Sequence, residues 1–144
     1  MKCFLVVFSL FISILAHAQQ TIAWNFSYNK ETKVLELSAD LADGWHLYSQ
    51  HIANDVGPVP TSFQFEENKA IKLIGKVNEP IPTQEYDENF EAMLDFFEDQ
   101  VIFTQRISVK KDTTVKGFVT FMMCNKTMCL PPSDQHFSIE LTTD

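Results

Sequence analysis

Two cysteines near the carboxyl end of the sequence are the residues best suited to chemistry. Four residues separate Cys124 from Cys129, an apolar stretch over residues 121–123 precedes them, and Leu-Pro-Pro follows. A strand, a tight turn and a second strand would place the two cysteines opposite each other, with Cα atoms about 4.5–5.5 Å apart. A disulfide tolerates this separation, so the pair can form a bridge and exchange it with other thiols.

The position of the pair leaves two roles open. The chain-entropy model gives a loop of this size about 2 kcal/mol of stabilisation, less than the roughly 3 kcal/mol of a fifteen-residue loop. A bridge that served only as a staple would be better placed between distant strands. We expect the hairpin tip to be exposed, which suits exchange, but the spacing alone does not separate a structural disulfide from a redox pair.

Three methionines beside the cysteines allow a third role, the binding of Cu(I). Met122, Met123 and Met128 lie with Cys124 and Cys129 within eight residues, and thiolate and thioether ligands suit Cu(I). Strand alternation would send Met122 and Met123 to opposite faces, and methionine often fills gaps in a core. Copper binding is therefore a weaker alternative, beside a non-catalytic secreted interaction module with a structural disulfide.

The first residues of the chain predict export. Lys2 precedes an apolar stretch over residues 4–15, and Ala-His-Ala at 16–18 completes the pattern of a cleavable secretory signal peptide. The apolar stretch is well short of the ~20 residues that span a bilayer. We expect a signal peptide at residues 1–18 and one mature domain at 19–144, in an oxidising compartment where disulfides persist.

Charge and composition exclude several classes of function. The formal net charge is −8, with 19 acidic and 11 basic residues, so the chain lacks the basic footprint of a nucleic-acid or membrane-surface protein. We expect no membrane span in the mature chain, no bound metal and a monomer. His46, His51 and His136 are too scattered to form a ligand set by spacing, and we expect each of them at the surface.

Alternation of apolar and polar residues predicts an all-β domain. Strands are expected over residues 22–28, 33–39, 45–48, 61–65, 71–77, 101–109, 115–124 and 135–141. So many short strands in one domain predict an antiparallel β-sandwich, with Trp24, Trp45 and Tyr48 in its core. The stretch 90–98 could instead be helical, because its apolar residues fit a helical stripe, and acidic residues crowd it on both sides.

Four segments of the sequence together carry a family pattern. They are Gly-Trp-His-Leu-Tyr at 44–48, Pro-Thr-Ser-Phe at 60–63, Asp-Glu-Asn-Phe at 87–90, and the cysteine pair with Leu-Pro-Pro at 124–132. Read together, they resemble the N-terminal periplasmic domain of DsbD, the membrane thiol:disulfide interchange protein. The resemblance covers residues 21–141, and the cysteine segment is its most specific part. It implies an immunoglobulin-like β-sandwich in the periplasm.

The resemblance also implies a role for individual residues. Cys129 would form the mixed disulfide with partner proteins, and Cys124 would be its resolving partner. Phe90 would match the aromatic tip of a cap loop that covers the disulfide until a partner docks. Glu88 falls near an acidic position of the family site, and Tyr48 falls near an aromatic position.

The same resemblance implies a protein-disulfide reductase type of activity without a cofactor. DsbD's own thioredoxin-like C-terminal domain supplies reducing equivalents, which pass to periplasmic thioredoxin-like proteins such as disulfide isomerases and cytochrome c maturation factors. The sequence departs from the family pattern twice. Well-known members have five residues between the cysteines rather than four, so the hairpin tip must differ. No membrane or thioredoxin-like part follows Asp144, so the donor would be a separate membrane protein or part of a longer chain.

Overall fold

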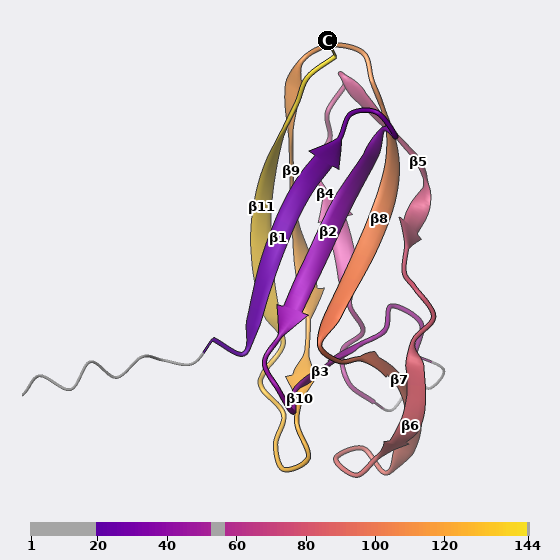
Figure 1. Ribbon diagram of the computed structural model, residues 1–144, viewed down its shortest axis with the longest axis vertical. Coiled ribbons are helices and arrows are strands. Elements are labelled where there is room, and N and C mark those ends of the chain that lie inside the picture. Colours follow the sequence, from indigo (N-terminus) through magenta and orange to yellow (C-terminus); the bar gives the residue numbers. More distant parts are fainter. Residues whose placement is uncertain (1–19, 53–56, 144) are drawn as a thin grey trace, which may run out of the picture.

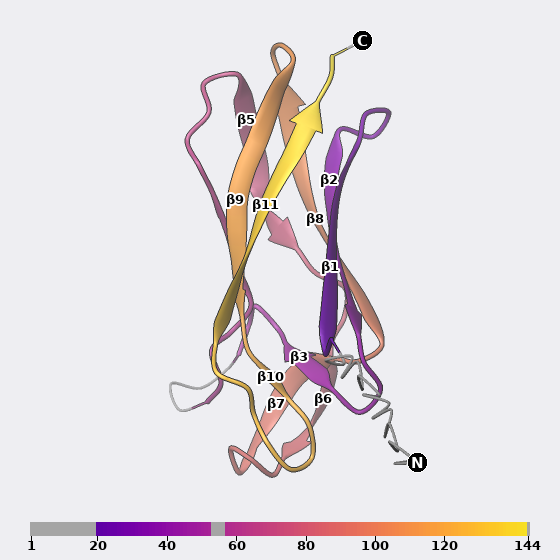
Figure 2. The same cartoon turned by 90° about the vertical axis from the view of Figure 1, so that its left-hand side faces the viewer.

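The computed structural model describes residues 20–52 and 57–143. The predicted signal peptide, residues 1–18, lies outside the described residues. Within the described ranges the chain forms eleven β-strands and no helix, and hence no helix long and apolar enough to cross a membrane. Two sheets stack face to face, as the edge-on view of Figure 2 shows, and a third sheet of shorter strands lies at the end away from the C-terminus (Figure 1).

Both large sheets are antiparallel throughout. The first has the strand order β1 (Ile22–Asn29), β2 (Val34–Leu41), β8 (Gln100–Val109), β5 (Ile71–Asn78). The second has the order β11 (Ser133–Leu141), β9 (Thr113–Phe121), β4 (Ser62–Phe65). This two-layer arrangement confirms the predicted immunoglobulin-like β-sandwich.

The sandwich core follows directly from the alternation in the sequence. Every second residue of β2, β8 and β9 is buried, because side chains of a strand point alternately to the two faces of its sheet. Leu37, Phe103 and Val119 are fully buried between the layers. Trp24 and Trp45 pack against this core as predicted, but Tyr48 is buried in a second, separate cluster.

The third sheet has the order β10 (Met123–Cys124), β3 (His46–Tyr48), β7 (Ala92–Phe97), β6 (Thr83–Asp87). One face of this sheet closes the end of the sandwich, since Leu47 and Met123 pair across the ladder and join the main core. The opposite face carries the second cluster, whose buried members are Tyr48, Leu94, Phe96 and Cys124. The two cysteines therefore pack in the second cluster and not in the main core.

The helical alternative for residues 90–98 is wrong. Residues 92–97 form strand β7, which pairs with β3 on one side and β6 on the other. Pairing on both edges satisfies the backbone of β7, and this long-range gain overrides the helix-like spacing of its apolar residues. Strand β6 was not expected, because four of its five residues are exposed and show no alternation.

Candidate functional site

Cys124 and Cys129 form a disulfide, with their Cα atoms 4.0 Å apart. The two residues face each other across an antiparallel bridge. Behind them, the backbone N–H of Leu130 donates a hydrogen bond of 2.8 Å to the carbonyl of Met123. The predicted first strand and tight turn are present, but the second strand is reduced to a single bridge at Cys129, which is sufficient to bring the two sulfurs together.

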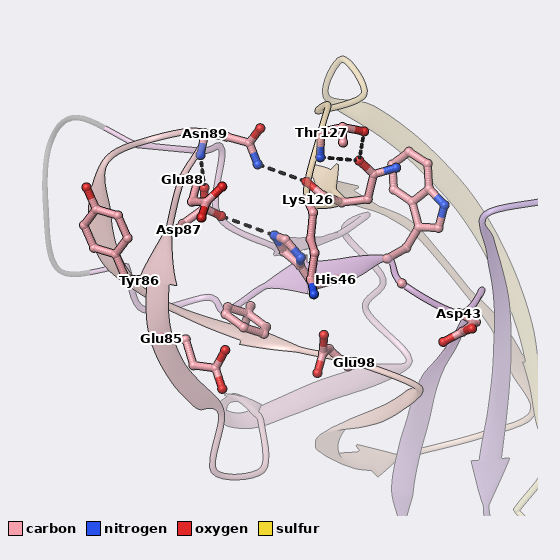
Figure 3. Close-up of a pocket in the computed structure, with 14 residues that line it drawn as sticks. Asp43, His46, Glu85, Tyr86, Asp87, Glu88, Asn89, Glu98, Lys126 and Thr127 are labelled. Carbon is pink, nitrogen blue, oxygen red and sulfur yellow. Dashed lines mark hydrogen bonds and ion pairs between the residues drawn. The ribbon is translucent and has the colours of Figure 1, made fainter.

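The tip of this cysteine hairpin is closed by Asn125. Its Oδ1 atom accepts backbone N–H bonds of 2.9 Å from both Thr127 and Met128, the pattern by which asparagine stabilises a turn. Its own N–H donates to the carbonyl of Met128. The Asn89 side chain donates a bond of 3.0 Å to the Asn125 carbonyl (Figure 3). This bond ties the hairpin to the turn between β6 and β7.

The two cysteines differ in exposure. Cys124 is fully buried, while Cys129 is partly exposed. The hairpin tip at residues 126–128 is exposed as expected, but Cys124 is not, because β10 pairs with β3 and brings Cys124 into the second cluster beside Tyr48 and Phe96. An incoming thiol would reach Cys129 first.

Phe90 lies in the turn between β6 and β7, beside the disulfide. Its ring is partly buried and meets the Tyr48 ring edge to face, with centroids 5.9 Å apart. Phe90 and Cys129 both pack against the second cluster. We call residues 87–91, which connect β6 to β7, the cap turn. The structure thus brings Tyr48, Phe90 and both cysteines together.

The carboxylate that organises the cap turn is Asp87 rather than Glu88. Asp87 is only 5% exposed and accepts hydrogen bonds from the Tyr48 hydroxyl at 2.6 Å, the Asn89 N–H at 2.8 Å and the Phe90 N–H at 3.2 Å. Glu88 is exposed. The role of Asp87 could have been predicted from the Asp-x-Asn sequence at 87–89, because a short acidic side chain in a turn often accepts hydrogen bonds from the backbone N–H groups that follow it.

His46 lies in the site rather than at the surface, where its isolated position in the sequence predicted it. Its side chain is 13% exposed rather than at the surface, whereas His51 and His136 are exposed as expected. Its Nε2 atom lies 3.0 Å from the Tyr48 hydroxyl and 3.3 Å from an Asp87 oxygen (Figure 3). Contacts with the rings of Tyr48 and Phe96, whose centroids lie 5.0 and 4.7 Å from that of His46, explain its partial burial.

Burial and hydrogen bonding set the charges of this group. Burial would raise the pKa of Asp87, but the bonds from Tyr48 and the two cap-turn N–H groups hold it below its usual 3.8. Burial and the bond to Asp87 raise the pKa of Tyr48 far above its usual value. Burial lowers the pKa of His46 below 6.5, against the attraction of Asp87 and Glu98. At neutral pH Asp87 is therefore charged, Tyr48 protonated and His46 neutral.

A groove of about 630 Å³ lies beside the cap turn and the cysteine hairpin (Figure 3). His46 and Phe96 contribute to its floor, and Lys126 brings a positive charge from the hairpin. The remaining charged residues that line the groove are acidic: Asp43, Glu85, Asp87, Glu88 and Glu98. The groove gives solvent a route to the buried imidazole.

The methionines near the cysteines do not converge. Met123 is buried in the main core, whereas Met122 packs against the second cluster and Met128 is half exposed. Within residues 20–52 and 57–143, no three His, Cys, Asp or Glu side chains are grouped so that they could hold a metal ion. The predicted divergence of Met122 and Met123 is confirmed, and it weighs against the copper alternative.

Comparison with known proteins decides the family. The model of the N-terminal domain of the thiol:disulfide interchange protein DsbD matches residues 15–141. The chain belongs to this family. No curated protein sequence matches it, so the DsbD N-terminal family membership rests on the family model.

Solved structures show the same fold at low sequence identity. The DsbD N-terminal domain of Neisseria meningitidis in its reduced form has a TM-score of 0.64 and 14% identity, over 85% of this chain and 86% of that chain. The complex of the DsbD and PilB N-terminal domains from the same organism gives 0.62 and 13%, over 87% of each chain. The N-terminal periplasmic domain of ScsB from Proteus mirabilis gives 0.52 and 16%, over 85% of this chain and 45% of that chain.

Proposed function

We propose that this DsbD-family domain exchanges thiols and disulfides with thioredoxin-like proteins of the periplasm through Cys124 and Cys129. Family membership supports the class of reaction. The observation that carries the proposal is a disulfide between one buried and one partly exposed cysteine, at one end of the molecule (Figure 1), with Phe90 packed against the same cluster as Cys129. A cleaved signal at residues 1–18 and a mature domain at 19–144 belong to the same proposal.

The proposed exchange moves two electrons and two protons. A thiolate of a reduced partner attacks the Cys129 sulfur, a partner–Cys129 bond forms, the Cys124–Cys129 bond breaks, and Cys124 leaves as a thiolate that takes up a proton. The second thiol of the partner then attacks the mixed disulfide, which leaves Cys129 reduced and the partner oxidised. Run in reverse, Cys129 attacks an oxidised partner and Cys124 resolves the mixed disulfide.

Relatives support the location and the kind of partner. The ScsB domain of similar fold is described as periplasmic. The DsbD N-terminal domain of Neisseria meningitidis was solved in complex with the PilB N-terminal domain, so a domain of this fold docks with a second protein domain. For this chain we propose a monomer that meets thioredoxin-like proteins, with a membrane protein as the source of electrons.

Trapping with single cysteine variants tests the division of roles. Cys124→Ser leaves the partly exposed Cys129 as the only thiol of the pair, and should form a mixed disulfide with an oxidised thioredoxin. Cys129→Ser leaves only the buried Cys124, and should form it at least about tenfold more slowly because access limits the attack. Mass spectrometry after alkylation measures both adducts. Equal rates for the two variants would contradict the assignment.

Stability after reduction separates a redox disulfide from a structural one. If the disulfide is a redox pair, we expect reduction to leave the fold intact, because a bridge between residues five apart in the sequence adds only about 2 kcal/mol, against roughly 5–15 kcal/mol for a domain. Neither cysteine belongs to the sandwich core. Thermal unfolding followed by circular dichroism, with and without reductant, measures the difference. Loss of the cooperative transition on reduction would instead support the structural staple.

A further inference from the structure

His46 connects the disulfide to the cap turn. In the ladder between β3 and β10 it stands directly opposite Cys124, so the two side chains share one face of the sheet. Its ring packs on Phe96, with centroids 4.7 Å apart, and its Nε2 atom contacts Asp87. The imidazole therefore touches the same carboxylate that holds the backbone of the cap turn.

The hydrogen bonds fix which atoms carry protons in the closed arrangement. The Tyr48 hydroxyl donates its proton to Asp87 at 2.6 Å, so its oxygen can only accept from His46. The Nε2 atom of His46 must then be the donor, toward the Tyr48 oxygen at 3.0 Å and the Asp87 oxygen at 3.3 Å. The neutral ring with its proton on Nε2 satisfies this network.

We propose that His46 is a positioning residue that makes closure of the Phe90 cap depend on pH, with acidification favouring the open cap. The proposal rests on the proposed function, since it concerns access to the same disulfide. Its basis is geometric: one partly buried imidazole, one buried carboxylate and two cap-turn N–H groups form a single connected network. A second proton on the imidazole places a charge on a ring that is packed between Tyr48 and Phe96 and is only 13% exposed.

Titratable groups from every neighbouring element surround His46 or line its groove. They are Tyr48 on its own strand, Asp87 and Glu85 on β6, Glu88 in the cap turn, Glu98 after β7, Asp43 before β3 and Lys126 in the hairpin. Attraction from Asp87 and Glu98 favours a protonated ring. Burial acts against it and outweighs both carboxylates, which leaves the pKa of His46 below 6.5 in the closed arrangement.

The direction of the pH response follows from linkage. When the cap opens and water reaches the ring, the pKa of His46 returns toward 6.5, so the open arrangement binds more protons than the closed one. A fall in pH therefore raises the ratio of open to closed cap. The rise begins near pH 6.5 and continues until the pH is below the pKa that His46 has in the closed arrangement. Asp87 remains charged through this window, because its pKa lies below 3.8.

Reduction by a small water-soluble phosphine, between about pH 5.5 and about pH 7.5, measures access to the disulfide. The matched variant is His46→Gln, which keeps a side-chain N–H donor but does not titrate. Dividing the wild-type rate by the variant rate at each pH removes the pH dependence of the reagent itself. We expect this ratio to rise about threefold or more on acidification. His136→Gln, at an exposed site, should behave as wild type.

A ratio that stays constant or falls on acidification would overturn the proposal. A second measurement needs no variant: the backbone amide resonances of Asn89 and Phe90 in the wild-type protein should titrate with a midpoint below 6.5, and resonances that do not move would also overturn it. The phosphine requires no partner protein. If the phosphine rate depends on pH as expected but the domain does not exchange with thioredoxin, the proposed function is wrong while the pH-dependent cap is supported.

Discussion

Replacing Phe90 with alanine is expected to speed reaction of the disulfide with a small dithiol about tenfold. The partly buried ring packs on the second cluster beside Cys129, where burial of apolar area contributes about 1.5 kcal/mol to the closed cap. A loss of 1.4 kcal/mol raises the open population about tenfold. Exchange with a thioredoxin should change less, because a docking partner displaces the cap turn itself.

Phe118→Ala is the matched control for this variant. Phe118 is also partly buried, but it lies on β9 in the sandwich and pairs with His136 rather than with the second cluster. The control should lose similar stability and leave the rate with dithiothreitol unchanged. Stopped-flow kinetics at matched protein concentration compare the two. If Phe90→Ala unfolds the domain, or leaves the rate unchanged in folded protein, Phe90 is a core residue and not a cap.

Replacing Asp87 with alanine is expected to have the largest effect on stability of any change at the site. It leaves the buried Tyr48 hydroxyl and the N–H groups of Asn89 and Phe90 without their acceptor. Each unsatisfied buried group costs about 1–3 kcal/mol, reduced where water can enter. We expect a loss of about 3 kcal/mol in urea unfolding, with a freely reactive disulfide. Glu88→Ala removes the exposed neighbouring carboxylate and should change stability by less than about 0.5 kcal/mol.

The contribution of Asp87 to stability depends on pH with a defined sign. Because the pKa of Asp87 is lower in the folded protein than 3.8, its charged form stabilises the fold above that value, and this contribution is lost as pH falls through the folded pKa. Urea unfolding of wild type should therefore weaken below about pH 4 more steeply than that of Asp87→Asn. Parallel curves for the two proteins would show that Asp87 is not held by the cap turn as described.

The alternation of apolar and polar residues along the sequence was sufficient to predict the strands of the sandwich, but not all strands of the sheet that carries the site. The alternating burial of β2 and β8 follows from residue type alone. Strand β6 shows no such alternation, since it is an edge strand with mostly exposed side chains. Its existence depends on pairing with β7, which the sequence of either segment alone does not specify.

The residues of the site divide in the same way. The cysteine hairpin is a local structure, and its spacing predicted it. Asp87 and His46 acquire their roles from contacts with distant segments, such as the bond between Tyr48 and Asp87, which are 39 residues apart. Glu88 was expected at the site from the family resemblance, and it lines the groove, but the burial and hydrogen bonds of its neighbour Asp87 could not be read from the sequence.

The most direct test of the central claim mixes the oxidised mature domain with an equimolar amount of reduced thioredoxin. After acid quenching and alkylation, mass spectrometry counts the free thiols of both proteins. We expect Cys124 and Cys129 to gain two hydrogens while thioredoxin loses two. This reduction of the disulfide should be faster than reduction by dithiothreitol at the same concentration. A disulfide that dithiothreitol reduces while thioredoxin leaves it intact would contradict the claim and identify the bridge as structural.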